Sequence, residues 1–594
     1  MIPLSALAFC SSFLLIHSVS AAPPPSAKEG WYARPTSAAE EGWWSAAPTL
    51  ATRKGSWSAA PTSATKEGWS AAPAPAAEEG CLNQANNSTL TVDVGHTEYQ
   101  GFYNETSNLF SWEGMQYGHV TRFQQATMPA AVSGTQLALA QGPHCSQFQA
   151  NGIDSPVFPG EEQCLFLNVY VPKALRCSRI PAPVVVWIHG GGYGYGYPDA
   201  FGTATNALDF DDGKTIMVTI QYRLGVFGFL AGSEIHQSGE SNLGIYDQIL
   251  ALQWVHEHIS AFGGNPEHVT IWGESAGAGS AMMLTQAFGG KLGTSLWQGC
   301  ISNSPYEPIQ YTYDDPVPQN YYNSMLELTN CTGPDNFTCL SNAPYESTFW
   351  AGSNLSQTLS PYGQWSANPV TDGRILLEPP SQALYPGKVN GEYMYAGHLT
   401  HEGHVFANPN ITTMASLNHW FDSLYPLVSD QTRDLVWEIY PEAQYSNDSY
   451  TNNYLRGAAL VGDWTFRCPA YWLAAAFPEG KGFKYIDNIG TAYHGSDLTY
   501  FFNDAGAASN ESSARAYLVG SMTAFWQTWN PTTNPAVSGL DWKPFDAATA
   551  YNEITYALVD NTTNSDTYAY VSAFGVAEPS ECTFLRAIGP QIPE

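Results

Sequence analysis

The segment that most constrains the fold of this 594-residue chain is His268–Ser280, which reads HVTIWGESAGAGS. The apolar residues before Gly273 predict a short buried strand, and the small residues after Ser275 predict a helix. Between them, Gly273-Glu-Ser-Ala-Gly277 has the G-x-S-x-G pattern, which in this context predicts a sharp turn that exposes the serine hydroxyl. An ordinary strand–turn–helix is the alternative, because glycine and serine are common in loops. If Ser275 is a nucleophile, the chain must also supply a base, an acid and oxyanion donors.

The sequence around this turn alternates between apolar strands and a helix. Residues 184–188 and 215–223 are largely continuous apolar runs, which are typical of strands buried on both faces. Residues 242–262 predict an amphipathic helix that stops at Gly263-Gly264. Elements in this order predict a mostly parallel sheet with helices on both faces. The predicted apolar side of the helix contains Leu250, Trp254 and Ile259.

Several motifs between residues 160 and 280 together resemble those of one family. They are Tyr222-Arg-Leu-Gly225, Asp247-Gln248, Ala251-Leu-Gln-Trp-Val255, Phe262-Gly-Gly264 and Gly273-Glu-Ser-Ala-Gly277. With them the chain closely resembles the type-B carboxylesterase/lipase family, which includes cholinesterases and secreted fungal lipases, over roughly residues 88–594. The resemblance implies an α/β-hydrolase fold and a secreted fungal-type esterase that hydrolyses small-molecule carboxylic esters without a cofactor.

The resemblance also implies where the base and the acid lie. Enzymes of this fold carry serine, acid and histidine in that order along the chain, so the histidine comes late. His494 follows the apolar segment 482–487 and lies in a His-x-x-Asp loop similar to that of the family's catalytic histidine. Glu402 matches the acid of the family's Asp-Glu-Gly motif, although His401 replaces the aspartate. A structural histidine and a solvated loop carboxylate are the alternative interpretations.

The expected oxyanion donors lie in a glycine-rich turn and at the serine turn itself. Strand 184–188 runs into His189-Gly-Gly-Gly-Tyr193, which is the H-G-G-G type of oxyanion loop. By resemblance to the family, the backbone N–H groups of Gly191, Gly192 and Ala276 would hold the oxyanion.

A metal site is the competing interpretation of the segment around Glu402. His398, His401 and His404 surround this carboxylate in the sequence. We expect no metal, because the H-E-x-x-H pattern is absent and Gly403 weakens a helix that could present the three imidazoles together.

Cys145 and Cys164 bracket a loop that bears on the substrate. A disulfide would close 18 intervening residues, with a stabilisation of about 3 kcal/mol. In lipases of the family the corresponding loop is long and forms a lid, whereas in cholinesterases it carries a tryptophan that stacks on choline. Residues 146–163 are too few for such a lid and contain no tryptophan. We therefore expect an esterase, with a triacylglycerol lipase and a non-catalytic adhesion protein of the same family as alternatives.

The remaining cysteines and the N-terminus indicate secretion. Residues 1–21 resemble a signal peptide that lacks a basic start, and its removal with Cys10 leaves nine cysteines. Cys331 and Cys339 are expected to form a small disulfide loop, whereas the sequence does not decide the pairing of Cys81, Cys177, Cys300, Cys468 and Cys582. Ten N-x-S/T sequons fit a glycoprotein. They begin at Asn86, Asn87, Asn104, Asn330, Asn336, Asn354, Asn410, Asn447, Asn510 and Asn561.

Residues 22–80 differ in composition from the predicted catalytic domain, residues 81–594. They repeat Glu-Gly-Trp and Ser-Ala-Ala-Pro units, and such short repeats rich in proline, alanine and glycine predict disorder. The recurring tryptophans Trp31, Trp43, Trp57 and Trp69 leave open a tail that binds carbohydrate or a wall polymer. The net charge of −31 disfavours nucleic acid and anionic membranes as partners. No apolar run after the N-terminal segment is long enough to predict a membrane span.

Overall fold

The structure is a computed structural model that describes most of the chain from residue 90 onward. The described residues are 90–176, 178–385, 387–441, 452–477, 480–502, 509–545, 551–558, 567–574 and 578–589. The predicted signal peptide, the repeat tail, Cys81 and Cys177 lie outside them, as do the sequons at Asn86, Asn87, Asn447 and Asn561.

An 11-stranded sheet, in the order β14-β13-β12-β11-β10-β9-β7-β8-β6-β4-β3, is the central element of the described residues. From β8 to β13 each strand is parallel to its neighbours, whereas the strands at both edges pair antiparallel. The predicted α/β-hydrolase architecture with a mostly parallel sheet is therefore confirmed. The strand bounds are β3 Phe102–Asn104, β4 Leu109–Gln116, β6 Phe166–Pro172, β7 Ala182–Ile188, β8 Ile216–Ile220, β9 Gly264–Glu274, β10 Gly299–Asn303, β11 Tyr393–Leu399, β12 Gly482–Asn488, β13 Tyr551–Leu558 and β14 Thr567–Phe574. A separate small sheet contains β1 Thr91–Asp93, β2 Glu98–Gln100 and β5 Thr135–Leu137.

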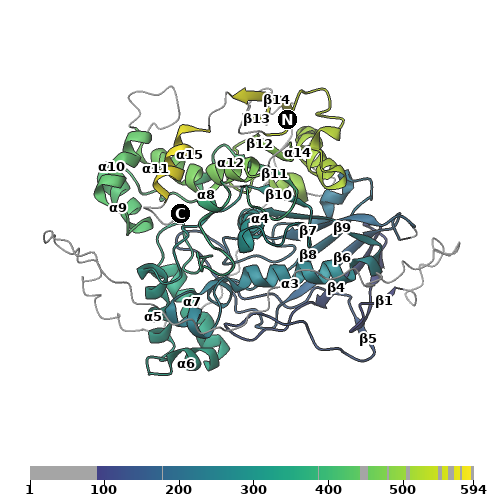
Figure 1. Ribbon diagram of the computed structural model, residues 1–594, viewed down its shortest axis with the longest axis horizontal. Coiled ribbons are helices and arrows are strands. Elements are labelled where there is room, and N and C mark those ends of the chain that lie inside the picture. The colour runs from purple at the N-terminus through teal and green to yellow at the C-terminus, as the bar shows by residue number, and fades with distance from the viewer. Residues whose placement is uncertain are drawn as a thin grey trace, which may run out of the picture. The chain divides into compact units, whose positions relative to one another are not determined.

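Helices and helical turns connect these strands (Figure 1). The α-helices are α1 Gly225–Phe229, α2 Ser233–Ser238, α3 Leu243–His258, α4 Ala276–Gln286, α5 Pro316–Leu328, α6 Asn336–Asn342, α7 Tyr345–Thr358, α8 Pro380–Ala383, α9 Met414–Leu424, α10 Asp430–Ile439, α11 Asn453–Gly462, α12 Cys468–Ala475, α13 Leu498–Phe502, α14 Ser509–Thr528 and α15 Ser580–Ile588. The shorter turns are η3 Ala204–Phe210, η4 Ile259–Phe262, η5 Ala287–Gly289, η6 Glu402–His404, the π-helical η7 Asp463–Arg467 and η8 Pro531–Thr533.

The sheet is buried on both faces, and its pleat divides the core in two. Along β7, Val184 and Val186 pack into the cluster that contains residues of α3 and α4. Val185 and Trp187, which alternate with them, pack into the cluster that contains residues of α14 and η3. Successive strand residues point to opposite faces, so an uninterrupted apolar run is what a doubly covered strand requires.

The helix predicted at residues 242–262 forms, but the prediction that it is amphipathic is wrong. α3 ends at His258 and continues as η4, and Gly263 terminates it with φ +93°. α3 packs against α1, α4 and β9, so it is buried on several sides instead of one apolar stripe. Even its polar Asp247 is buried, in a 2.6 Å ion pair with Arg223.

Three disulfides link described parts of the chain. Cys145–Cys164 and Cys331–Cys339 are the two pairs expected from the sequence. The third pair, Cys468–Cys582, joins α12 to α15 across a sequence separation of 114. Cys300 on β10 is buried, and it is a free thiol in this described part of the molecule.

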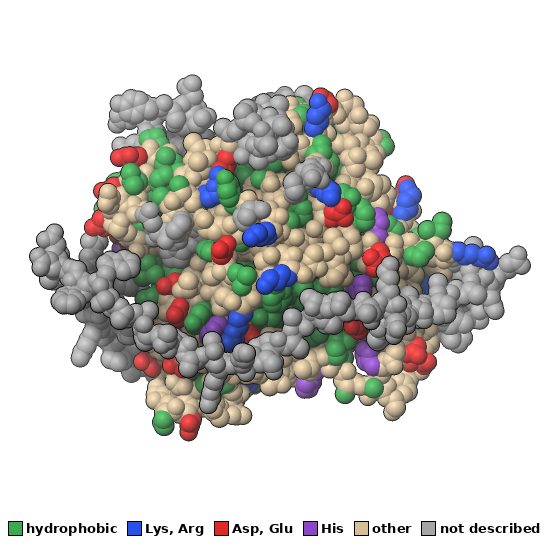
Figure 2. All heavy atoms as spheres, in the orientation of Figure 1, with side chains coloured by type: hydrophobic (Ala, Val, Ile, Leu, Met, Phe, Trp, Pro, Cys, Tyr) green, Lys and Arg blue, Asp and Glu red, His purple; other side chains and the backbone are tan. Residues whose placement is uncertain are grey.

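The surface is acidic overall but has no segregation of charge on the face seen in Figure 2. Acidic and basic side chains are interspersed there among polar and apolar ones. In the part of the chain that the structure describes, every helix is too short or too polar to cross a membrane.

Candidate active site

Ser275 lies at the sharp turn between β9 and α4. Its backbone has φ +57° and ψ −125°, a conformation that non-glycine residues rarely adopt. A Cβ atom at Gly273 would overlap the backbone of Gly277, and one at Gly277 would overlap the carbonyl oxygen of Ile188. Both glycines of the motif are therefore required by the close approach of α4 to β9 and β7.

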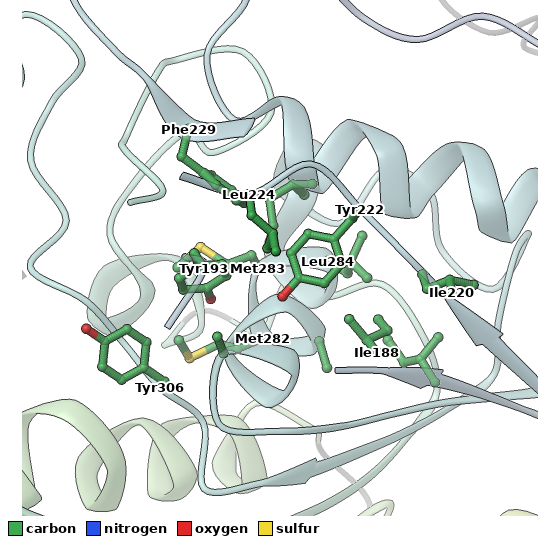
Figure 3. Packing of buried hydrophobic residues seen from close by; sticks show 14 of the residues in the cluster. Ile188, Tyr193, Ile220, Tyr222, Leu224, Phe229, Met282, Met283, Leu284 and Tyr306 are labelled. Carbon is green, nitrogen blue, oxygen red and sulfur yellow. The ribbon is translucent and has the colours of Figure 1, made fainter. Parts of the chain in front are cut away.

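Close packing holds α4 behind this turn. Figure 3 shows Met282, Met283 and Leu284 of α4 among aromatic side chains that include Tyr193 and Tyr222. All five side chains are fully buried. Such packing transmits any displacement of the helix, so the serine turn is fixed by the core as well as by its own hydrogen bonds.

His494 joins Ser275 to Glu402. Its Nδ1 lies 2.6 Å from Oε2 of Glu402, and its Nε2 lies 2.8 Å from Oγ of Ser275. The other carboxylate oxygen of Glu402 accepts the N–H of Leu399 at 2.7 Å. Glu402 follows β11, and His494 follows β12, so the three side chains come from the carboxyl ends of three parallel strands. The structure thus brings together the three residues that the sequence singled out as catalytic.

The glycine-rich loop after β7 lies against the serine. A Cβ atom at Gly190 would come within 2.9 Å of Cβ of Ser275. Gly191 and Gly192 have φ +107° and +61°, which turn the loop in a way that favours glycine. Ala276 is the first residue of α4, so its N–H has no acceptor within the helix and lies at the helix's positive end. The glycine-rich loop thus approaches the serine at Gly190, and Ala276 directly follows the serine in the chain.

Aromatic side chains enclose the imidazole. The rings of Phe466 and Phe406 lie 4.4 and 5.1 Å from that of His494. Phe466 belongs to η7, a π-helical turn, and such turns occur frequently at functional sites. Trp365 packs against Gly192 of the glycine-rich loop and donates its indole N–H to the carbonyl oxygen of Phe148. Phe466, Phe406 and Trp365 are themselves buried, so this side of the site is closely packed.

Additional buried carboxyl groups lie near Glu402, and the sequence analysis did not single them out. Oε1 of Glu274 lies 3.7 Å from Nε2 of His494, and among the described residues it has no hydrogen-bond partner. Burial raises the pKa of Glu274 well above its usual value, and the nearby Asp497 and Glu402 raise it further. Burial likewise raises the pKa of Asp497, and it raises that of Asp487 to about 7. Glu274 directly precedes the serine, and Asp497 ends the His-x-x-Asp motif, so both could have been found as the polar members of these motifs.

The histidines of the metal alternative do not converge. Nδ1 of His398 lies 2.8 Å from Nζ of the buried Lys484. The Nδ1 atoms of His401 and His404 instead lie 3.0 and 3.1 Å from the backbone oxygens of Thr491 and His401. No group of three or more histidine, cysteine, aspartate or glutamate side chains in the described ranges is arranged to hold a metal ion.

The loop between Cys145 and Cys164 is fully described and contains no helix. Its backbone bridges Gln147 to Phe158, and several of its side chains, including Phe148, are buried. The loop is therefore packed onto the body of the protein.

Comparison with known proteins identifies the family. A model of the carboxylesterase family matches residues 88–571. The chain belongs to the carboxylesterase family. Secreted lipase 1 of Botryotinia fuckeliana is 32% identical to this carboxylesterase over 464 residues, which cover 69% of this chain and 79% of the lipase. Carboxylesterase patB of Penicillium expansum is 30% identical, with 62% and 68% covered.

Solved structures agree with this assignment. The crystal structure of Aspergillus niger EstA has a TM-score of 0.72 and 26% identity to this carboxylesterase, and covers 85% of this chain and 99% of its own. A solved PNB esterase shares the fold at a TM-score of 0.67 and 22% identity, with 84% and 99% covered. The chain is thus an enzyme of the carboxylesterase family with an α/β-hydrolase fold.

Proposed function

We propose that this protein is a secreted serine esterase whose triad is Ser275, His494 and Glu402. The observation that carries the proposal is the position of His494, which contacts Oγ of Ser275 and the carboxylate of Glu402 through its two ring nitrogens. Hydrolysis of carboxylic esters by a serine needs this arrangement, because the imidazole must accept the serine proton while a carboxylate fixes its tautomer.

In the acylation step, His494 takes the proton of Ser275 through Nε2, and Oγ attacks the ester carbonyl carbon. The N–H groups of Gly191, Gly192 and Ala276 stabilise the oxyanion that forms. Glu402 accepts the N–H at Nδ1 of His494 and stabilises the imidazolium. The imidazolium then gives its proton to the alcohol oxygen, the ester C–O bond breaks, and the acyl group stays on Ser275.

In the deacylation step, water replaces the alcohol. His494 removes a proton from the water, whose oxygen attacks the acyl carbonyl carbon, and the same donors hold the second oxyanion. The proton then returns through His494 to Oγ of Ser275, and the carboxylic acid leaves. None of these steps requires a cofactor or a metal ion.

We favour soluble esters over lipid droplets as substrates. The loop between Cys145 and Cys164 is short, carries no helix and is packed down, so it offers little as a movable amphipathic lid. Triacylglycerol hydrolysis is the second candidate, because one relative is named a secreted lipase. Rates on soluble butyrate esters and on emulsified long-chain triacylglycerols separate the two, and faster turnover of the emulsion would replace the esterase assignment by lipase.

A non-catalytic adhesion protein of the same fold is the third candidate function. It is disfavoured because adhesion does not need a serine, a histidine and a glutamate in hydrogen-bonding contact, and such contacts between buried polar groups are costly to maintain without a role.

Export from the cell, with glycosylation, is part of the proposal. The sequons at Asn104, Asn330, Asn354 and Asn410 have exposed asparagines that a glycan could occupy. The three disulfides suit an oxidising compartment. We further propose that the catalytic domain spans residues 81–594, preceded by a cleaved signal in 1–21 and a low-complexity repeat tail in 22–80, for which binding of carbohydrate or a wall polymer is the alternative role. Sequencing the N-terminus of the exported protein tests the signal.

The decisive experiment replaces Ser275. Ser275→Ala should abolish hydrolysis of p-nitrophenyl acetate and labelling by a fluorophosphonate probe, while the melting temperature stays near that of the wild type. The exposed loop serine Ser295 provides the matched control, and Ser295→Ala should keep full activity. Undiminished turnover by Ser275→Ala would refute the mechanism.

A further inference from the structure

The disulfide loop, residues 145–164, lies against the glycine-rich loop, residues 189–196. A backbone hydrogen bond joins the two loops, since the N–H of Phe148 donates to the carbonyl oxygen of Gly194 at 2.7 Å. The side chain of Gln147, which is fully buried, adds further hydrogen bonds between them. The disulfide loop is therefore in a position to fix the shape of the glycine-rich loop.

The amide of Gln147 binds both polar groups of the Gly196 backbone. Its Oε1 accepts the N–H of Gly196 at 2.5 Å, and its Nε2 donates to the carbonyl oxygen of Gly196 at 3.0 Å. Nε2 also donates to the carbonyl oxygen of Cys145 at 2.8 Å. A primary amide has one oxygen and two N–H groups, so each of these groups is used. The side chain thus ties the last residue of the glycine-rich loop to the disulfide.

Gly196 closes the glycine-rich loop onto its own start. A Cβ atom at Gly196 would come within 2.3 Å of the carbonyl oxygen of Gly190 and of Nδ1 of His189. Gly190 in turn lies against Ser275, because a Cβ atom at Gly190 would come within 2.9 Å of Cβ of the serine. In a core that is packed so closely, a displacement of Gly196 moves the part of the loop that touches Ser275.

Hydrogen bonds within the glycine-rich loop set the directions of two proposed oxyanion donors. In a trans peptide, the carbonyl oxygen and the following N–H point in opposite directions. The carbonyl oxygen of Gly190 lies 2.9 Å from Nδ1 of His189, which fixes the direction of the N–H of Gly191. The carbonyl oxygen of Gly191 accepts the N–H of Gly194 at 3.0 Å, which fixes the N–H of Gly192. Both donors thus depend on the shape of a loop whose end is held by another segment.

We propose that Gln147 is a positioning residue that keeps the N–H groups of Gly191 and Gly192 aligned on the oxyanion by holding Gly196. The inference rests on the proposed triad and oxyanion donors, and it adds a residue that acts through the loop. These donors act on charge that develops only in the transition state, so their misalignment lowers kcat and leaves KM nearly unchanged. A misplacement of about 1 Å costs roughly 100-fold in rate.

Gln147→Met tests the proposal, because it keeps the length of the side chain and removes its three hydrogen bonds. Acylation and deacylation use the same donors. On p-nitrophenyl acetate we therefore expect kcat to fall by about 10- to 100-fold, while KM changes by less than about threefold. A trifluoromethyl ketone measures the donors directly, since attack by Ser275 on it forms a tetrahedral adduct that bears an oxyanion. Its Ki should rise by the factor by which kcat/KM falls.

Two further variants separate positioning from folding. In Gln147→Glu, a protonated carboxyl group can still accept the N–H of Gly196 and donate to its carbonyl oxygen. Its loss of kcat relative to the wild type should therefore be smaller, and should grow as the pH rises and the carboxyl group ionises. Gln149 lies on the same loop, but its Nε2 donates to the carbonyl oxygen of Ile153 within that loop, at 2.9 Å. Gln149→Met should therefore keep the wild-type kcat.

Each kcat is referred to the fraction of enzyme that a fluorophosphonate probe labels at completion, so misfolded protein does not count as a loss of rate. An unchanged kcat in Gln147→Met, a change confined to KM, or an unchanged Ki for the ketone would overturn the proposal. An equal loss of kcat in Gln149→Met would do the same. If Gln147→Met does not fold, a loss in Gln147→Glu that is independent of pH would overturn it. Persistent hydrolysis by Ser275→Ala would instead overturn the triad, so the two failures are distinguishable.

Discussion

Lys484 and Asp487 lie three residues apart on β12, so the strand pleat directs them to opposite faces of the sheet. Both side chains are fully buried. Nζ of Lys484 contacts Nδ1 of His398 at 2.8 Å and the carbonyl oxygen of Tyr485 at 2.6 Å, and it lies 3.9 Å from Oε2 of Glu553. On the other face, one oxygen of Asp487 accepts the N–H of Ile489, but the other has no partner in the described part of the chain.

The two regions differ in how their charge is balanced. Around Lys484, an amine, an imidazole and a carboxylate are combined, and the hydroxyl of Tyr471 donates to Glu553 at 2.8 Å. Around Asp487 lie further carboxyl groups, Glu402 and Asp497, and the basic group in contact with this acid cluster is the imidazole of His494. The first region pairs a buried base with a buried acid, whereas the second gathers carboxyl groups that lie close together, and its Glu402 contacts the imidazole of His494. We infer that the first serves the fold and the second the reaction.

The largest expected effect comes from removing the charge of Glu402. Glu402→Gln keeps the shape of the side chain but cannot stabilise the imidazolium, so kcat on p-nitrophenyl acetate should fall by about 10³- to 10⁴-fold. The melting temperature should change by only a few degrees. A fall of less than tenfold would show that another carboxyl group of the acid cluster is the true partner of His494.

The next largest effect is expected from replacing Lys484. This change should lower the stability of the protein and not its activity. Lys484→Met leaves Glu553 buried without its cation and should lower the free energy of unfolding by about 3 kcal/mol. Activity per folded molecule should stay within about threefold, since the amine does not touch the triad. Adding Glu553→Gln should restore part of the stability, and denaturant melts of the two variants measure it. A double variant that is less stable than Lys484→Met would contradict the charge-pair interpretation.

A smaller effect is expected from Glu274, and it should depend on pH. Because burial raises the pKa of Glu274, its carboxyl group keeps its proton to a higher pH than a free glutamate does and ionises as the pH rises further. The ionised form, 3.7 Å from Nε2 of His494, favours the imidazolium. Glu274→Gln should therefore match the wild type under mildly acidic conditions and fall behind by up to about tenfold at alkaline pH. Parallel profiles of kcat/KM for the two proteins would rule this out.

The smallest expected effect is on how the stability of the folded protein depends on pH. The buried groups on the two faces of β12 should change this stability with opposite signs. The pKa of Asp487 is raised to about 7, so the folded protein keeps this proton while the unfolded chain loses it, and stability falls between pH 4 and 7. Burial lowers the pKa of Lys484 to about 7, so the unfolded chain holds that proton longer, and stability rises above pH 7.

Denaturant melts at several pH values test these signs. Asp487→Asn should flatten the fall below pH 7, and Lys484→Met should flatten the rise above it. Asp487→Asn with an unaltered slope between pH 4 and 7 would show that this carboxyl group is not the one that holds the proton.

The acid cluster also shows which parts of the site the sequence could predict. Ser275, Glu402 and His494 were found because each follows a recognisable strand in a fixed order along the chain. Glu274 and Asp487 were missed. Glu274 could have been found as the polar residue directly before the serine, whereas Asp487 ends an apolar strand like many surface residues. Both come near Glu402 only when β9, β11 and β12 are placed in one sheet.

The contacts around Lys484 could not be predicted from the sequence for a related reason. Lys484 interrupts the apolar segment 482–487, where a single lysine suggests an exposed edge, and its partners come from strands far away in sequence. The pairing of Cys468 with Cys582 also needed the fold, because spacing alone does not select it among the unassigned cysteines. The prediction that α3 is amphipathic was wrong because helices and a strand cover it on several sides. The periodicity of apolar residues in the sequence does not reveal such neighbours.

The close contact of Gly277 with Ile188 has a consequence for redesign of the enzyme. β7, β9 and α4 meet there without space for one extra carbon atom. The turn that carries Ser275 is therefore rigid. Libraries that aim at new activities should leave Gly273 and Gly277 unchanged and diversify residues that do not touch the serine turn. Tolerance to mutation should therefore be lowest at these two glycines.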